Sequence, residues 1–90
     1  MEFSISDEHL EKYIRSTSLN ERRYTLQEEC AELIQELSKM NRYKSDWLKI
    51  TEEMTHVLIC LYSVAKDIGI EQSNIDWQVK LKEERENGKQ

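Results

Sequence analysis

The stretch LQEECAELIQELSKM, from Leu26 to Met40, places apolar side chains three or four residues apart. This spacing predicts an amphipathic helix, because residues at these intervals share one helical face. The apolar seam of this helix consists of Leu26, Cys30, Leu33, Leu37 and Met40. A second seam of the same kind follows and consists of Trp47, Ile50, Met54, Val57, Leu58, Leu61, Ala65 and Ile68. Two such helices, joined by a short connection at residues 42–46, predict a long antiparallel helix hairpin.

Cap and stop residues predict four helices in one domain of residues 1–90. The expected N-terminal caps are, in chain order, Ser6 or Asp7, Asn20, Ser45 or Asp46, and Ser73 or Asn74. The first helix and its loop occupy residues 1–18, the second helix reaches about residue 41, and Gly69 ends the third. Residues 87–90 are expected to form a frayed tail.

The composition favours an all-α fold. The chain has no proline and only two glycines among 90 residues, whereas a β-rich fold needs frequent turn residues. A chain of this size buries only about 60% of its extended surface, so its own core is marginal. The third helix is also apolar over a wider arc than one partner helix can cover. We therefore expect a small bundle of about four helices, completed by assembly into a homodimer or homotetramer.

Net charge and hydropathy exclude several classes of partner. The formal net charge is −5, which disfavours binding to a nucleic acid polymer because phosphate backbones select clustered cations. No apolar run approaches the ~20 residues of a membrane span, and the N-terminus does not resemble a signal peptide. Two cysteines are too few for a disulfide framework. These features predict a cytoplasmic protein with reduced thiols.

Both hairpin helices carry potential metal ligands on one flank of the seam. A rotation of about 100° per residue places several of these side chains on the same flank of each helix. They are Glu29, Glu32 and Glu36 on the second helix, and Glu53, His56 and Cys60 on the third. If the seams pair, the two flanks face one cleft, where carboxylates of like charge repel each other. A divalent cation with hard oxygen ligands, Mg²⁺ or Mn²⁺, would remove this repulsion.

Simpler interpretations of the same residues stay open. Glutamate is a good helix former, and most helical glutamates face water. His56 and Cys60 are four residues apart and could instead share a zinc ion, although no second histidine or paired cysteine supports this. Cys30 and Cys60 also fit small core residues, and His9 fits a surface residue.

Two motifs resemble a known family. The run EECAE, from Glu28 to Glu32, matches the pattern E-E-x-x-E, and EMTH, from Glu53 to His56, stands where E-x-x-D is expected. This pair of motifs on successive helices resembles the MazG-like all-α nucleoside triphosphate pyrophosphohydrolases, a superfamily that includes the all-α dUTPases. The similarity extends from about Leu26 to Ile70.

The resemblance implies a reaction and a set of site residues. The reaction is hydrolysis of a nucleoside triphosphate to a nucleoside monophosphate and pyrophosphate, with Mg²⁺ or Mn²⁺ as cofactor. The implied metal ligands are Glu29, Glu32, Glu53 and His56. Glu28 is implied as a residue that orients water, and Glu29 or Glu32 as the base. Histidine in place of aspartate at position 56 weakens the expected Mg²⁺ affinity and shifts the expected preference toward Mn²⁺ or another transition metal.

Substrate contacts are less clearly marked in the sequence. Candidate cations for the phosphates are Lys39, Arg42, Lys80 and Arg85. Candidate aromatic partners for a base are Trp47, Trp77, Tyr24, Tyr43 and Tyr62. A solvated helix surface explains the cations equally well, and core or interface packing explains Trp47 and Tyr62. The alternatives to an enzyme are a non-catalytic module that binds a nucleotide or a protein, and a structural helical oligomer.

Overall fold

Four helices make up the chain in the computed structural model, which describes residues 2–42 and 46–88. They are α1 (Asp7–Ser16), α2 (Leu19–Arg42), α3 (Trp47–Ile68) and α4 (Gln72–Asn87). Within these two ranges the structure contains no strand. The prediction of a small all-α fold with about four helices is therefore confirmed. None of the four helices combines the length and apolar character needed to cross a membrane.

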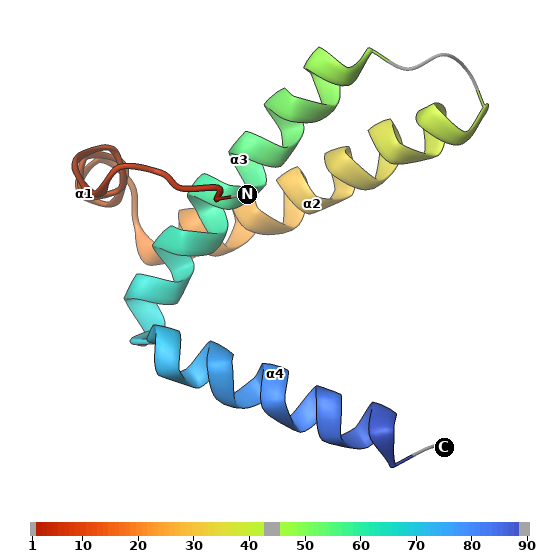
Figure 1. The fold of residues 1–90 in the computed structure, drawn as a ribbon. Helices are drawn as coiled ribbons and strands as arrows, with labels where there is room; N and C mark the ends of the chain where they lie inside the picture. The colour runs from red at the N-terminus through yellow and green to blue at the C-terminus, as the bar shows by residue number, and fades with distance from the viewer. Residues whose placement is uncertain (1, 43–45, 89–90) are drawn as a thin grey trace.

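The long hairpin of α2 and α3 is the centre of the fold. Figure 1 shows the two helices side by side and running in opposite directions, and α1 packs against α3. Buried apolar side chains come from α1 and α3, namely Leu10, Ile50, Cys60 and Val64. Cys60 and Val64 lie in the half of α3 toward the base of the hairpin, whereas Ile50 lies in the first turn of α3 near the tip.

Toward the tip of the hairpin several seam residues are exposed, although Ile50 is buried. Met40 near the end of α2 and Trp47 at the start of α3 are 49% and 67% exposed, and Leu37 is also exposed. The predicted antiparallel hairpin is present, and within a single chain part of its apolar seam near the tip is left exposed. Trp47 is likewise not a core residue of the single chain. An apolar pattern identifies which face of a helix is suited to burial, but it does not identify the element that packs against that face.

The helix caps agree with the sequence at two of the four N-termini. The Ser6 side chain accepts a hydrogen bond from the His9 backbone N–H at 3.2 Å, and the Asp46 side chain accepts one from Leu48 at 2.9 Å. At its other end α3 stops at Gly69, where φ is 88°. This left-handed conformation suits glycine, which has no Cβ.

The predicted caps of α2 and α4 are wrong by two or more residues. Ser18 rather than Asn20 caps α2, because the Ser18 hydroxyl accepts a hydrogen bond from the Glu21 N–H at 3.1 Å. At α4, Glu71 occupies the cap position. Asn74 lies inside the first turn, where its side-chain oxygen accepts a hydrogen bond from the Glu71 N–H at 2.8 Å. The segments before α2 and α4 each contain several polar residues in succession, so the sequence alone does not identify which of them is the cap.

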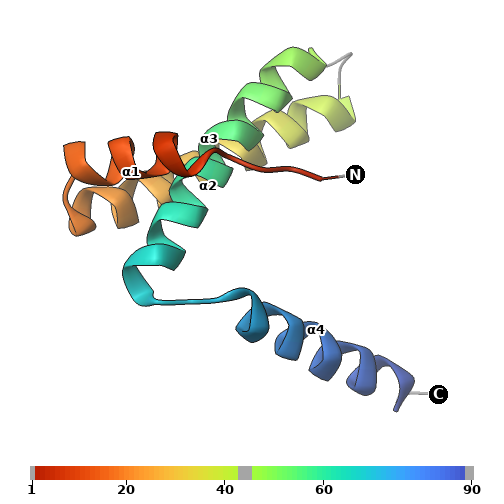
Figure 2. The same cartoon turned by 60° about the vertical axis from the view of Figure 1, so that its left-hand side comes forward.

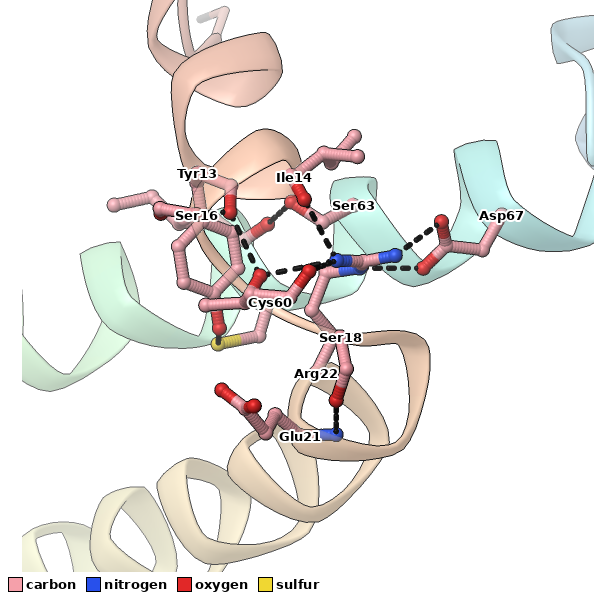
Figure 3. A network of polar contacts seen from close by, with 11 residues as sticks. Tyr13, Ile14, Ser16, Ser18, Glu21, Arg22, Cys60, Ser63 and Asp67 are labelled. Atoms are coloured by element: carbon pink, nitrogen blue, oxygen red, sulfur yellow. Dashed lines mark hydrogen bonds and ion pairs between the residues drawn. The ribbon is translucent and has the colours of Figure 1, made fainter.

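A buried arginine fixes the base of the hairpin. The Arg22 guanidinium, on α2, donates from Nε and Nη2 to the two carboxylate oxygens of Asp67 on α3, at 2.7 and 2.9 Å. Its Nη1 donates to the carbonyl oxygens of Ile14 and Thr17 and to the Thr17 hydroxyl. Figure 3 shows Arg22 between Asp67 and the end of α1. This group, the Arg22 clamp, ties all three helices together.

The last helix projects away from the other three. In Figures 1 and 2, α4 leaves the base of the hairpin and extends outward. Every residue of α4 except Leu81 is exposed. Residues 89 and 90 of the predicted tail lie outside the described residues, and α4 itself continues to Asn87.

Candidate metal centre

Three side chains from the two hairpin helices meet at one point. Glu29 comes from α2, and Glu53 and His56 come from successive turns of α3. Each offers one ligand atom, and these atoms all lie within 4.8 Å of one another. Residues three apart share a face of a helix, which is why Glu53 and His56 both face α2. We call these three residues the acid cluster, and they are a group that could hold a metal ion.

The acid cluster contains buried oxygen atoms that lack partners. Glu53 is only 3% exposed. One carboxylate oxygen of Glu53 and one of Glu29, both Oε2, are buried and have no hydrogen-bond partner in the described chain. A buried carboxylate oxygen needs a hydrogen-bond donor or a cation beside it, because leaving it unpaired costs free energy in a folded protein.

The contact between His56 and Glu29 does not remove this deficit. His56 Nδ1 lies 3.3 Å from Glu29 Oε2, but the arrangement lacks the geometry of a hydrogen bond. The pair is attractive only when the imidazole carries a proton. The His56 side chain is 43% exposed, so one edge of the acid cluster is open to solvent.

A lysine next to the acid cluster compensates part of its charge. Lys49 Nζ lies 3.2 Å from Glu53 Oε1, four residues along α3, and 3.2 Å from Glu52 Oε2. Burial alone would raise the pKa of Glu53, but the ion pair with Lys49 and the neighbouring Glu32 side chain bring that pKa below its ordinary value. The i, i+4 spacing of Lys49 and Glu53 was visible in the sequence. The effect of Lys49 on the Glu53 carboxylate could not be predicted from this spacing, because the effect depends on the burial of Glu53.

Glu32 belongs to the same electrostatic unit without belonging to the group of ligand atoms. Its side chain is exposed, one turn beyond Glu29 on α2. The adjacent Glu53 carboxylate, together with repulsion from Glu29, raises the pKa of Glu32. The structure therefore separates two predicted ligands, Glu29 and Glu53, from a third carboxylate that lies beside them.

The donor set fits a divalent cation better than it fits zinc held by a thiolate. Two carboxylates and one imidazole are ligands of hard and intermediate cations, and the two buried oxygens without partners would gain a partner. Cys60 lies outside the group; its sulfur is 3.6 Å from the Tyr13 hydroxyl. Burial raises the pKa of the Cys60 thiol, whereas zinc binding needs the thiolate. Cys60 is 4% exposed, in keeping with its interpretation as a core residue.

A pocket of about 210 Å³ adjoins the acid cluster and is formed by all three packed helices. We call it the side pocket. Its lining residues are His9, Tyr13, Thr25, Glu29, His56, Ile59 and Cys60. Glu29 and His56 belong to both features, so a ligand in the side pocket would lie next to an ion in the acid cluster.

Two residues of the side pocket were not expected from the sequence. His9 is exposed, as predicted, yet it lines the pocket, and Tyr13 lies opposite α3. Burial and the hydrogen bond with Cys60 raise the pKa of Tyr13 to about 12. Both residues come from α1, and only the packing of α1 on α3 brings them to the site. No sequence spacing encodes that contact.

The other predicted site residues lie elsewhere. Glu28 is exposed on α2 and outside the acid cluster. Lys39 pairs with Glu36 at 3.0 Å. Arg42 is the last residue of α2, and its side chain lies outside the described part of the structure. Lys80 lies 5.8 Å from the centre of the Trp77 ring on α4.

The remaining candidates for substrate contacts are also separate from the acid cluster. Arg85 borders a second hollow, of about 390 Å³, that is lined by α4 residues alone. Tyr24, Trp47 and Trp77 are exposed, and the Tyr62 hydroxyl donates to the Phe3 carbonyl oxygen at 3.3 Å. Tyr43 lies outside the described residues.

Comparison with known proteins adds no relative to this picture. No family model, curated protein or solved structure matches the chain. The resemblance to MazG-like enzymes therefore depends on the two sequence motifs, and the argument for a site depends on the geometry of the acid cluster.

Proposed function

We propose that the chain is a metal-dependent nucleoside triphosphate pyrophosphohydrolase, which converts a nucleoside triphosphate and water to a nucleoside monophosphate and pyrophosphate. One observation carries the proposal: Glu29 and Glu53, from adjacent helices, lie in one cluster with His56, and each has a buried oxygen without a hydrogen-bond partner in the described chain. The E-E-x-x-E and E-x-x-H motifs that place these residues support the same reaction.

The proposed cofactor is Mg²⁺ or Mn²⁺, held by Glu29, Glu53 and His56. Carboxylate oxygens suit both ions, and an imidazole nitrogen favours Mn²⁺ over Mg²⁺. Such an ion bound to the phosphates neutralises developing charge and activates water. The exposed edge at His56 leaves room for phosphate oxygens and water to complete the coordination.

Glu32 is the best candidate for the general base. The neighbouring carboxylates raise its pKa, and a carboxylate with a raised pKa is a stronger proton acceptor. In the proposed step, the oxygen of water bonds to the α-phosphorus and the bond from that phosphorus to the bridging oxygen of the β-phosphate breaks. The proton of the water passes to Glu32, and pyrophosphate leaves with the electron pair of the broken bond.

The side pocket is suited to the nucleoside part of the substrate. It offers a phenol at Tyr13, an imidazole at His9 and an aliphatic surface at Ile59. Flat aromatic groups can stack on a base, and the polar edges can form hydrogen bonds with it. Lys80 and Arg85 are on α4, so their proposed contact with phosphates would require a second copy of the chain.

The proposed compartment is the cytoplasm. Cys30 and Cys60 are both free thiols, and free thiols are typical of a reducing compartment. A pool of nucleoside triphosphates is also present there, which the proposed reaction requires.

The direct test is release of pyrophosphate from a panel of canonical and modified nucleoside triphosphates, with Mg²⁺ or Mn²⁺. We expect turnover by the natural chain and none by the double variant Glu29→Gln, Glu32→Gln. The matched control is Glu21→Gln, an exposed acid on the same helix, which should retain full activity. Equal pyrophosphate release by the natural chain and the double variant would exclude catalysis at this site.

A second candidate is a non-catalytic module that binds a nucleotide. The observation that favours it is His56, a neutral and 43% exposed ligand where the family pattern has an aspartate. The loss of one negative charge weakens the hold on the ion. Calorimetry distinguishes the two functions, because nucleotide binding without any turnover supports the module.

A further inference from the structure

Helix α4 exposes large apolar side chains that no other described part of the chain covers. Ile75, Trp77 and Val79 are 50%, 56% and 51% exposed. Figures 1 and 2 show α4 extending away from the other helices in both views. Single exposed apolar residues are normal, but a helix that has several and packs on nothing needs an explanation.

The apolar residues of α4 occupy two opposite faces. At about 100° per residue, Ile75 and Val79 lie on one side of the helix, and Trp77 and Leu81 lie about 200° away. An ordinary surface helix has a single apolar face, directed at its own core. A helix with two such faces needs cover on both sides. One hairpin could not supply both surfaces even if α4 folded back onto it.

The accessible surface area of the chain also indicates that α4 lacks a partner surface within one copy. The accessible surface of the chain is 7514 Å², whereas a compact monomer of this mass exposes roughly 5,500 Å². The radius of gyration is 15.8 Å, against roughly 12 Å for a compact domain of this length. The excess of roughly 2,000 Å² per chain is more than the roughly 800 Å² that each partner contributes to a standard stable interface.

We propose that α4 is an association arm, and that a second copy of this chain covers both of its apolar faces. A second copy carries the surfaces that this requires. It has its own α4, and it has exposed apolar residues on its hairpin, namely Leu37, Met40, Trp47, Leu48, Met54 and Leu61. Charge does not oppose the contact, because residues 76–86 carry three cations and four acids. The two copies therefore meet through nearly balanced helices.

The test is the mass of the full-length chain in solution, measured by sedimentation equilibrium over a range of concentrations. We expect an assembly of at least twice the 10.8 kDa of one chain. The variant Ile75→Ala, Val79→Ala and the variant Trp77→Ala, Leu81→Ala should each weaken the assembly at least tenfold. Alanine preserves the helix, so the loss would be a loss of contact. The matched control Asp76→Ala, Gln78→Ala changes two exposed α4 residues that lie about 60° or more from both faces, and it should leave the assembly intact.

Fluorescence provides a second measurement. The chain has two tryptophans, so Trp47→Phe leaves Trp77 as the only one. Its emission should move to longer wavelength on dilution, as Trp77 leaves an apolar contact. A natural chain that stays at the mass of one copy up to roughly 100 µM would overturn the proposal. An assembly that survives in both double-alanine variants would also overturn it. Neither measurement depends on catalytic activity.

Discussion

The Arg22 clamp and the acid cluster are two polar groups between the same helices, and they differ in how completely their atoms are paired. Arg22 makes five hydrogen bonds, two of them to Asp67. The acid cluster has two buried oxygens without a partner in the described chain, on Glu29 and Glu53. A saturated group has nothing left to bind and stabilises the fold. An unsaturated group of like charges gains most from a partner that comes from outside.

The protonation of the two groups differs in the same way. The hydrogen bond to Asp67 raises the pKa of Arg22, in spite of burial, so the clamp stays an ion pair. Beside the acid cluster, the Glu53 and Glu29 carboxylates raise the pKa of Glu32, which reflects repulsion between neighbouring acids. Electrostatic repulsion of this kind, in a fold whose Arg22 clamp is fully paired, is typical of functional sites.

The largest expected effect comes from breaking the saturated group. Arg22→Met leaves the Asp67 carboxylate, whose side chain is 12% exposed, without its partner. Removing one member of a buried ion pair costs about 3–5 kcal/mol of the free energy of unfolding. Urea denaturation measures this loss. The control is Arg23→Met, the neighbouring exposed arginine, which should change the free energy by less than about 0.5 kcal/mol. Equal losses in the two variants would show that the clamp is not structural.

Removing a charge from the acid cluster should weaken metal binding and leave the stability of the fold nearly unchanged. Glu53→Gln is expected to lower Mn²⁺ affinity at least tenfold, because the substitution removes the buried carboxylate of the proposed metal site. The thermal stability of the metal-free protein should change little, since a repulsion is lost together with the contact to Lys49. Calorimetric titration with Mn²⁺ measures the affinity, and Glu52→Gln is the control on the adjacent, exposed position. Unchanged Mn²⁺ binding in Glu53→Gln would remove Glu53 from the site.

A smaller effect is expected from the lysine beside the acid cluster. Lys49→Gln removes a cation that lies 3.2 Å from Glu53 Oε1 and competes with the ion for negative charge. Because exposed ion pairs are weak, Mn²⁺ affinity should increase only roughly fivefold. The same titration tests this, with Lys39→Gln as the control, since Lys39 pairs with Glu36 instead. A decrease in affinity would mean that Lys49 supports the site.

The smallest effect concerns pH. Since the fold raises the pKa of Glu32, the folded state holds this proton more tightly than the unfolded state does. The metal-free fold is therefore destabilised as pH rises from the ordinary glutamate value through the raised one. Glu32→Gln should gain stability relative to the natural chain as the pH rises above the ordinary glutamate pKa of about 4.3. Thermal melts at several pH values, with Glu21→Gln as control, measure the difference. A difference that is constant with pH would contradict the repulsion.

Much of the fold could be predicted from the sequence. Apolar spacing gave the two hairpin helices, and Asp46 and Gly69 gave both ends of α3, because caps and left-handed stops depend on local residue chemistry. The Arg22 clamp could not be predicted. Its partners are 45 residues away at Asp67 and on the backbone of Ile14 and Thr17, and no local pattern marks such contacts.

The candidate site was predicted in part. Helical geometry places Glu29, Glu53 and His56 on facing flanks, and the structure brings these three together. The exposure of Glu32 and the presence of His9 at the side pocket depend on the exact rotation and packing of α1 and α2. Periodicity gives the face of a helix only to within a broad arc.

The most direct test of the central claim is a crystal of the natural chain grown with Mn²⁺ and measured for anomalous scattering. The account predicts an anomalous peak at coordination distance, about 2.1 Å, from oxygens of both Glu29 and Glu53 and from a nitrogen of His56. A map with well-ordered carboxylates, no peak between them and hydrogen-bonded water on both buried oxygens would contradict it.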